Sequence, residues 1–382
     1  MIRFLHFAKD DKFLESTIKG FLKEENIISD FIVYRHKYIK REKSFAEKCE
    51  NVEILSNKRE VISRLKSNTY DVLYIHSFYI NFWYLLKYVP DDKIIIWWVW
   101  GYDIYSPGLF GLNNFLELDY LKPLTKIAIS KSRPLITKIK YQLFRMFYSY
   151  KFENYKKSLI NRVDYVQPVL PIEFKMLKNI EGFHAKEFYR PNLISRKIVK
   201  DGLLNKKRDG SILIGNSASC PNNHLDVWIN VNHFIPKGRR IIIPLSYGDR
   251  LYGKYVKDNI SSDSYDFVFL DNFLDKEDYF NLMNSCTYAI YGSIRQHAIG
   301  NIFNAIKRGV KIFLFKDSII YKYLSQCGFA IYTIEDIDEN SFWTPLTMRD
   351  HIRNGDALLN YWKYQKDIGQ KAIEEITNRL SK

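Results

Sequence analysis

Short apolar runs alternate with amphipathic stretches along the first half of the chain. The runs have the length and the β-branched or aromatic content of buried strands. These predicted strands are Ile2–Phe7, Phe31–Tyr34, Val52–Leu55, Val72–Ile75, Ile94–Trp100 and the short run 164–171. Apolar residues at helical spacing predict helices at Phe13–Lys23 and Arg59–Lys66. This alternating order is typical of a parallel sheet covered by helices.

The same alternation returns in the second half, after a polar, basic stretch from Arg190 to Gly210 that we interpret as a linker. The predicted strands there are Ser211–Ile214, Arg240–Leu245, Phe267–Leu270, Tyr288–Tyr291 and Val310–Phe315. The predicted helices are Asn223–His233, Lys276–Cys286, Asn301–Arg308 and Asp356–Leu380. Two such domains favour an α/β fold of the GT-B type, with two Rossmann-like domains facing a cleft.

The length of 382 residues fits two domains of ordinary size. We expect an N-terminal domain over residues 1–195 and a C-terminal domain over residues 196–355. The last helix, residues 356–382, is expected to pack back toward the N-terminal domain.

Composition narrows the class of protein. With 46% apolar and 26% charged residues, the chain has the make-up of a folded globular protein, and its net charge of +15 indicates an acidic partner. Nucleic acid, an anionic membrane and a phosphorylated ligand all fit that description. Four cysteines without a CxxC pair exclude a zinc ribbon or a disulfide scaffold and indicate a reducing compartment. No apolar run is long enough for a signal peptide or a membrane span.

Residues 120–165 combine eleven Lys and Arg with interleaved aromatic residues and only two acidic ones, Glu153 and Asp164. A helix is expected from about Pro134 to Tyr150, with an apolar stripe bordered by basic residues. This pattern is typical of a helix that lies in a membrane interface. A core helix with a solvated basic face has the same pattern, so both interpretations stay open.

Two loops of the second half have the composition of ligand sites. Gly215, Asn216 and Ser217 follow a strand and precede a helix, an arrangement that suits a phosphate or a sugar hydroxyl. The loop matches neither a Walker A motif nor GxGxxG, and a turn that uses these residues for geometry alone is the alternative. The later loop carries Arg295 and Gln296. Arginine can hold a phosphate with two hydrogen bonds, unless this side chain only faces solvent.

The helix after that loop begins near Gly300 and Asn301, where free backbone N–H groups and the helix dipole favour an anion. No Asp-x-Asp pair stands in a convincing metal site. We therefore expect a metal-independent transfer, in which Arg295 and helix N-termini hold the departing phosphates.

Candidate bases lie in the first half. Asp103 comes just after the most apolar strand, where an apolar environment raises a carboxyl pKa and favours a general base. A helix-capping aspartate is the structural alternative. His76 follows the preceding strand in the same kind of place, and a structural histidine is its alternative. Either residue is expected to deprotonate an acceptor hydroxyl.

Taken together, these segments resemble glycosyltransferase family 56, the bacterial TDP-4-acetamido-4,6-dideoxy-D-galactose:lipid II transferases of enterobacterial common antigen synthesis. The matching segments recur in order over most of the chain. They are His76, Trp97–Tyr105, Ile212–Ser217 with Asn222 and His224, Ile243–Pro244 with Tyr247, and Arg295–Gln296 with Ile299–Gly300.

The resemblance implies a GT-B fold, a nucleotide-sugar donor in the second domain and a polyprenyl-diphosphate-linked acceptor at the first. It adds four residues to the donor site: Asn222, His224, Pro244 and Tyr247. The donor is expected to be linked to dTDP or UDP, with no separate cofactor, and the enzyme to lie at the cytoplasmic face of the bacterial inner membrane. The loop Ala218–Pro221 and the basic aromatic segment depart from the family pattern, which leaves the donor sugar and acceptor glycan open.

Two other functions compete with this interpretation. A GT-B-fold sugar-nucleotide epimerase would share the nucleotide site but would not need to bind a membrane. A nucleic-acid-binding protein would explain the positive charge, but the sequence contains no nucleic-acid motif.

Overall fold

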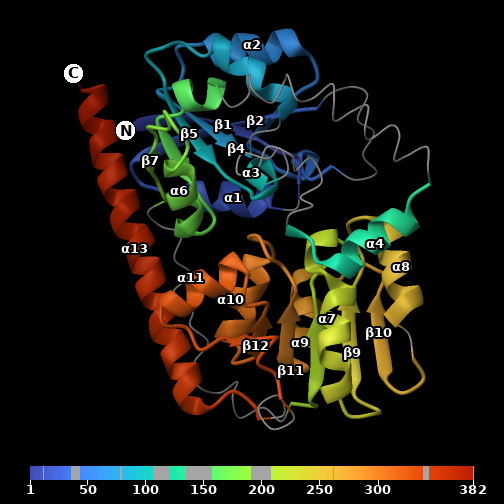
Figure 1. Cartoon of the computed structure of the whole chain (residues 1–382). Coiled ribbons are helices and arrows are strands. Elements are labelled where there is room, and N and C mark those ends of the chain that lie inside the picture. The colour runs from blue at the N-terminus through green and yellow to red at the C-terminus, as the bar shows by residue number, and fades with distance from the viewer. Residues whose placement is uncertain are drawn as a thin grey trace. The chain divides into compact units, whose positions relative to one another are not determined.

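The computed structural model of the chain describes residues 1–11, 13–35, 44–77, 80–105, 120–134, 157–190, 208–260, 262–338 and 344–381. Its contacts divide the chain into two compact units (Figure 1). The first unit consists of Met1–Leu112, Arg145–Ile194 and Trp362–Lys382. The second unit consists of Asn113–Phe144 and Ser195–Tyr361.

Parallel strands build the sheet of the first unit, in the order β3-β2-β1-β4-β5-β6-β7. They are β1 (Ile2–Ala8), β2 (Ile27–Tyr34), β3 (Val52–Leu55), β4 (Val72–His76), β5 (Ile94–Trp98), β6 (Tyr165–Gln167) and β7 (Lys186–Glu187). Strand β4 is buried along its whole length, as expected for a parallel sheet covered on both faces. The strand order reverses between β1 and β4, which makes their carboxyl ends the topological switch point of this sheet.

Helices of the first unit connect the strands and cover the sheet. They are α1 (Leu14–Phe21), η1 (Ala46–Lys48), α2 (Lys58–Lys66), η2 (Ile80–Tyr88), α3 (Tyr102–Tyr105), α6 (Pro171–Lys178) and the C-terminal half of α13 (Met348–Leu380). Glu375 of α13 binds Lys186 of β7 at 2.7 Å, and Arg379 binds Asp164 at 2.6 Å. These ion pairs, with the buried Ile376, hold the end of the chain against this sheet.

The second unit has a six-stranded parallel sheet whose order matches the first six strands of the first sheet. Its strands have the order β10-β9-β8-β11-β12-β13, with the reversal between β8 and β11. They are β8 (Ser211–Ile214), β9 (Arg240–Pro244), β10 (Asp266–Leu270), β11 (Cys286–Tyr291), β12 (Lys311–Leu314) and β13 (Tyr332–Thr333). Its helices are α4 (Pro123–Ser132), η5 (Cys220–Asn222), α7 (His224–Val231), η6 (Asn232–Phe234), α8 (Arg250–Ile260), α9 (Lys276–Ser285), α10 (Ile299–Lys307), α11 (Ile319–Gln326) and the start of α13.

Helix α4 belongs to this second unit, whereas the sequence placed all of residues 120–165 in the first domain. The carboxylate of Asp226 in α7 accepts hydrogen bonds from the backbone N–H groups of Leu124 and Thr125, at 2.9 and 2.8 Å. It therefore satisfies free donors in the first turn of α4. Figure 1 shows α4 beside α7 and α8. About one hundred positions separate the partners, so no local pattern reveals this contact.

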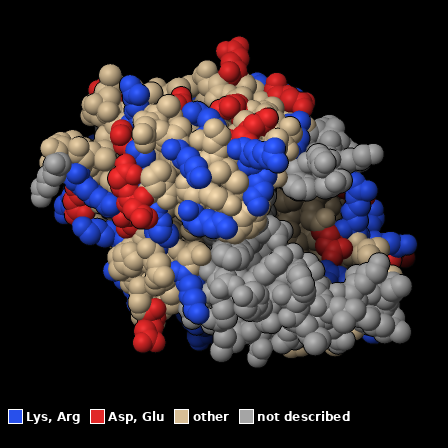
Figure 2. Space-filling model, turned by 90° about the horizontal axis from the view of Figure 1, so that it is seen from above, with Lys and Arg blue, Asp and Glu red and all other residues tan. Residues whose placement is uncertain are grey.

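The helix expected over residues 134–150 falls almost wholly outside the described residues, so the interfacial interpretation stays a prediction. In the part of the chain that the structure describes, no helix combines the length and the apolar character needed to cross a membrane. On the face shown in Figure 2, lysine and arginine side chains lie among acidic and uncharged ones.

Candidate active site

Glycines end both strands that flank the switch point of the second sheet. Gly215 follows β8 with a φ of +70°, and its N–H donates to the carbonyl of Ile290 in β11 at 2.9 Å. A Cβ at Gly215 would lie 2.6 Å from Nε2 of His224, and one at Gly292 would lie 2.2 Å from the carbonyl oxygen of Asn222. Side chains other than hydrogen do not fit there. The two loops are thus packed together at the edge where open α/β sheets bind ligands.

Asn222 and His224, both predicted to bind the donor, are completely buried beneath the Gly215 loop. The Asn222 amide donates to the backbone carbonyl of Ser217 at 2.9 Å and so supports the turn from below. Nδ1 of His224 lies 3.3 Å from the hydroxyl of Tyr252. Burial lowers the pKa of His224 to about 3, so its imidazole is neutral near pH 7. Both side chains shape the loop in this structure.

Several buried polar atoms around this loop have no hydrogen-bond partner among the described residues. They are Asn216 Oδ1, Asn222 Oδ1, His224 Nε2 and the Tyr291 hydroxyl. Such atoms are uncommon in folded proteins because each one costs about 1–3 kcal/mol. Their concentration where β8 and β11 end is an independent sign of a functional site.

The loop after β9 contacts the Gly215 loop through hydrogen bonds. Nδ2 of Asn216 donates to the Tyr247 hydroxyl at 3.1 Å, and an isolated bridge pairs Ala218 with Gly248. Burial raises the pKa of Tyr247. Pro244, the last residue of β9, is buried, whereas the Tyr247 side chain is 38% exposed. Of these residues, Tyr247 is therefore the one that can contact a ligand directly.

Arg295 and Gln296 are also nearly buried, at 6% and 7% exposure, so the alternative that Arg295 faces solvent is wrong. Arg295 donates from its guanidinium to the carbonyl of Gln296 at 2.6 Å. Helix α10 begins three residues later, and a Cβ at Gly300 in its first turn would have no atom within 4 Å. Neighbouring Asn301 is half-buried. Arg295 and the start of α10 thus both follow the end of β11, although the N–H of Asn301 already donates to the carbonyl of Ala298 at 2.8 Å.

In the first unit, both oxygens of Asp103 are engaged by its own loop. Oδ2 accepts a hydrogen bond from the indole N–H of Trp97 at 2.9 Å, and Oδ1 accepts from the backbone N–H of Trp100 at 2.8 Å. The side chain is 1% exposed. Asp103 therefore holds the turn at Gly101, whose φ is +72°. Both donors precede α3, so these bonds give Asp103 a structural role in the turn before the helix and not the expected cap on it.

His76 ends β4 at the switch point and is 5% exposed. Burial, and to a lesser extent the positive charge of Arg190, lowers its pKa to about 3. The ring borders a small cavity of about 10 Å³, whose other lining residues are Lys9, Asp11, Phe13, Leu14, Thr17 and Trp100. His76 thus presents a neutral imidazole at the carboxyl edge of the sheet.

The sequence did not single out two further buried polar residues. His6 contacts His76, and only its place inside the apolar run Ile2–Phe7 marked it. Glu173 is fully buried at the start of α6, where Oε2 accepts from the N–H groups of Val169 and Leu170. Burial raises its pKa to about 7. A proline followed two residues later by glutamate is a recognisable helix-start signal.

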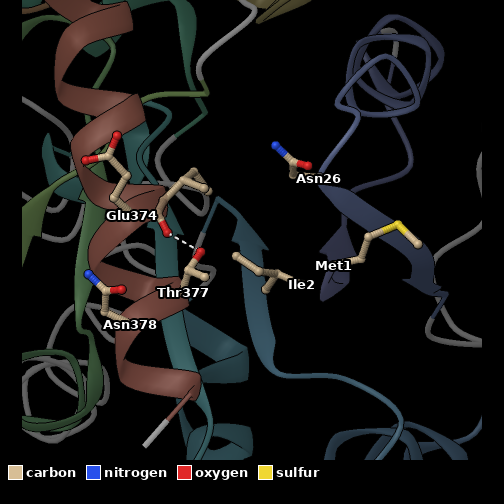
Figure 3. Close-up of a pocket in the computed structure, with 7 residues that line it drawn as sticks. Met1, Ile2, Asn26, Glu374, Thr377 and Asn378 are labelled. Carbon is tan, nitrogen blue, oxygen red and sulfur yellow. Dashed lines mark hydrogen bonds between the residues drawn. The ribbon is translucent and has the colours of Figure 1, made fainter.

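The opposite edge of the first sheet has a larger pocket of about 510 Å³ between the start of β1 and α13 (Figure 3). Its lining residues are Met1, Ile2, Asn26, Ile373, Glu374, Thr377 and Asn378. None of their side chains is basic. Among all described residues, no cluster of three or more His, Cys, Asp or Glu side chains is placed to hold a metal ion.

Comparison with known proteins gives one family match. The sequence model of the family described as 4-alpha-L-fucosyltransferase, glycosyl transferase group 56, matches residues 141–344, just over half of the chain. The curated proteins contain no match.

Solved structures show the fold. HepE of Anabaena, in complex with UDP and glucose, is 13% identical with a TM-score of 0.58, covering 99% of this chain and 100% of its own. A glycosyltransferase of Rickettsia africae is 12% identical with a TM-score of 0.56, covering 99% and 98%. An E. coli trehalose-6-phosphate protein bound with UDP-2-fluoro glucose is 11% identical with a TM-score of 0.55, covering 98% of each chain. The predicted α/β fold of the GT-B type, with two Rossmann-like domains, is confirmed.

Proposed function

The chain belongs to glycosyltransferase family 56, and from this premise we propose that it moves a sugar from a nucleoside-diphosphate donor to a polyprenyl-diphosphate-linked saccharide. The proposed sugar is a deoxy-acetamido sugar linked to dTDP or UDP. The proposed acceptor is an intermediate of bacterial surface polysaccharide synthesis. We further propose that the reaction is a metal-independent hexosyl transfer.

The proposed binding site for the sugar donor lies in the second unit, where strands β8 and β11 end. Two strands that are each followed by a glycine lie next to buried polar atoms without a hydrogen-bond partner among the described residues, and Arg295 lies in the loop that leads from β11 into α10. Backbone N–H groups at a helix start and an arginine are suited to stabilise a departing diphosphate. Two of the structural neighbours, HepE and the E. coli protein, are bound to uridine nucleotides, which supports the same ligand class here.

For the acceptor hydroxyl, we propose His76 as the general base and Asp103 as a positioning residue. The two oxygens of Asp103 already accept hydrogen bonds from Trp97 and Trp100. His76 is neutral and borders a cavity, so it can take up a proton. Its low pKa makes it a weak base in this structure.

A peripheral position on the cytoplasmic face of the inner membrane completes the proposal, because a polyprenyl-linked acceptor is held in the bilayer. Helix α4 exposes Leu124 and Ile127, together with the exposed Lys126 and Lys131. Exposed apolar side chains with basic neighbours are typical of a surface that contacts anionic lipids.

The first test is thermal unfolding with dTDP, UDP, GDP, ADP and CMP. A ligand at 100 times its Kd adds about 2.7 kcal/mol of stability, which appears as a shift of several degrees. We expect dTDP or UDP to stabilise the wild type and the exposed-site control Arg349→Ala equally, and Arg295→Ala much less. If no nucleotide stabilises the wild type, the donor site is wrong. If one nucleotide does stabilise the wild type, the sugar donor that contains this nucleotide is the substrate for a second test. With that donor, the turnover number of Arg295→Ala should be about 10²–10³ times lower than that of the wild type.

A further inference from the structure

Two buried histidines face each other across the switch point of the first sheet. His6 lies in β1 and His76 at the end of β4, the two strands between which the order reverses. Nδ1 of His6 is 2.9 Å from Nε2 of His76, and Nε2 of His6 is 3.1 Å from Oγ of Ser29 in β2. Three neighbouring strands thus contribute one continuous chain of hydrogen-bonding groups.

The His6 ring is fixed by its surroundings. It is fully buried, stacks on Phe31 with centroids 4.2 Å apart, and meets the edge of Phe21 at 4.3 Å. Both of its nitrogens have partners. A ring held in this way cannot turn to exchange its nitrogens, so the hydrogen bonds alone decide which nitrogen carries the proton.

Both rings are neutral near pH 7. Burial lowers the pKa of His6 and of His76, and the charges around them act in the same direction, because Arg190 is positive. Glu24 lies 3.9 Å from Arg190, and Lys9 and Asp11 line the cavity beside His76. The neighbouring Tyr74 hydroxyl donates to Gln167. With two neutral imidazoles, one must donate a hydrogen bond to the other.

The hydrogen bonds that link Ser29, His6 and His76 can run in two directions, and only one of them leaves His76 able to act as a base. If Nε2–H of His76 donates to His6, then Nε2–H of His6 donates to the Ser29 hydroxyl oxygen, and Nδ1 of His76 carries no proton. In the reverse direction, Nδ1 of His76 is protonated and cannot accept another proton. Among the described residues, no group is hydrogen-bonded to Nδ1 of His76, and His76 borders the cavity of about 10 Å³ described above.

We infer that Ser29 and His6 hold His76 in the tautomer with an unprotonated Nδ1, so that His6 is a positioning residue for the base. The inference rests on the proposed function. In the transfer step, the acceptor O–H bond breaks and its proton passes to Nδ1 of His76. The oxygen bonds to the anomeric carbon, while the bond from that carbon to the nucleoside diphosphate breaks and its electron pair leaves with the diphosphate. The Nε2–H bond to His6 persists and stabilises the imidazolium.

The direct test is nuclear magnetic resonance of the full chain labelled with ¹⁵N-histidine, because the ring nitrogens report the tautomer without any activity. Loss of signals in His6→Gln and His76→Gln assigns the two rings. We expect both rings to carry their proton on Nε2 in the wild type. Protonation of His76 on Nδ1 instead would overturn the inference.

Ser29→Ala provides a second variant that preserves the aromatic packing around His6. It removes the hydroxyl that accepts the hydrogen bond from His6, so His76 should become a mixture of tautomers. As a consequence, kcat should fall while KM stays unchanged. The decrease in kcat should be smaller than the about 10²–10⁴-fold that a general base contributes in total. Ser56→Ala, at an exposed position, is the control. An unchanged His76 tautomer in Ser29→Ala contradicts the inference.

The two levels of the proposal fail in different ways. If His76→Gln keeps the wild-type kcat, His76 is not the base and the proposed function loses that step, whatever the tautomers are. If His76→Gln is inactive but His6→Gln and Ser29→Ala retain full kcat, the base stands and the positioning role of His6 is wrong.

Discussion

Buried polar side chains of this protein gather where the central strands of the two sheets end. Asp103 shows what such a residue does for its loop, because its two oxygens join the indole of Trp97 to the backbone of Trp100. Residue types and their positions after strands could be predicted from the sequence. Whether a carboxylate is free or engaged could not, because the answer depends on which donors the fold brings to it.

We predict that Asp103→Asn destabilises the protein more than it affects the chemical step. An asparagine side chain can accept only one of the two hydrogen bonds, and a lost bond to a charged group costs about 1.5–3 kcal/mol. Urea unfolding of this variant, with the exposed Asp258→Asn as control, measures the effect. A variant as stable as the wild type but inactive would instead identify Asp103 as the base.

Stability should also fall as the pH is lowered from about 6.5. Burial lowers the pKa of His6, His76 and His224 in the folded protein. Below about pH 6.5, the unfolded chain therefore binds more protons than the folded chain, which favours unfolding. Each histidine removes up to about 1.4 kcal/mol per pH unit below its unfolded pKa. Glu173 acts in the opposite direction, because its raised pKa of about 7 makes stability fall as the pH rises from 4.5.

Urea unfolding at pH 7.5, 6.5 and 5.5 tests both the effect of the histidines and the opposite effect of Glu173 on the free energy of unfolding. Three histidines outweigh one glutamate, so the wild type should lose stability over this range. Glu173→Gln removes the opposing contribution and should make the loss steeper. Stability that is constant or rises toward pH 5.5 would show that the histidines are not buried as described.

At the scale of elements, the strands were the easiest to predict, since a strand buried on both faces is a continuous apolar run. Strand β5 ends at Trp98, two residues before the apolar run does, and α13 begins at Met348, eight residues before the predicted start. The two-residue strand β7 and the assignment of α4 to the second unit had no local signal. Both depend on partners distant in sequence.

Close approach of the loops after β8 and β11 predicts that Gly292→Ala is strongly destabilising. The new Cβ would lie 2.2 Å from a backbone oxygen, which cannot move aside as a side chain can. Gly355→Ala in α13 is the matched control, because nothing lies within 4 Å of its Cβ position. That variant should gain about 0.5–1 kcal/mol from helix propensity. Equal unfolding free energies for the two variants would contradict the packing described here.

At the scale of the whole molecule, the chain has two successive patterns of alternating strands and helices, and it forms two units that share the order of six strands. The net charge of +15 and the basic, partly apolar surface of α4 add the expectation of an anionic partner. Net charge bears on association and not on fold, so only binding measurements decide which anion is recognised.

We predict salt-sensitive binding to vesicles that contain anionic lipids, and little binding to neutral ones. Each lysine near an anionic surface contributes about 1 kcal/mol, so Lys126→Ala with Lys131→Ala should weaken binding about thirtyfold. Lys363→Ala with Lys371→Ala, on exposed positions of α13, is the charge-matched control. Equal losses in both pairs would mean that α4 is not the contact surface.

The amino-acid sequence by itself determined the two α/β units, the glycine and arginine loops at their strand ends, and the family. Each of these depends on residues that are neighbours in the chain or repeat at a short period. Only the tertiary structure decided that α4 joins the second unit through Asp226, that Asp103 is engaged by two tryptophan residues, and that His6 faces His76. Parallel strands place residues about seventy positions apart side by side, and no local pattern encodes such a pairing.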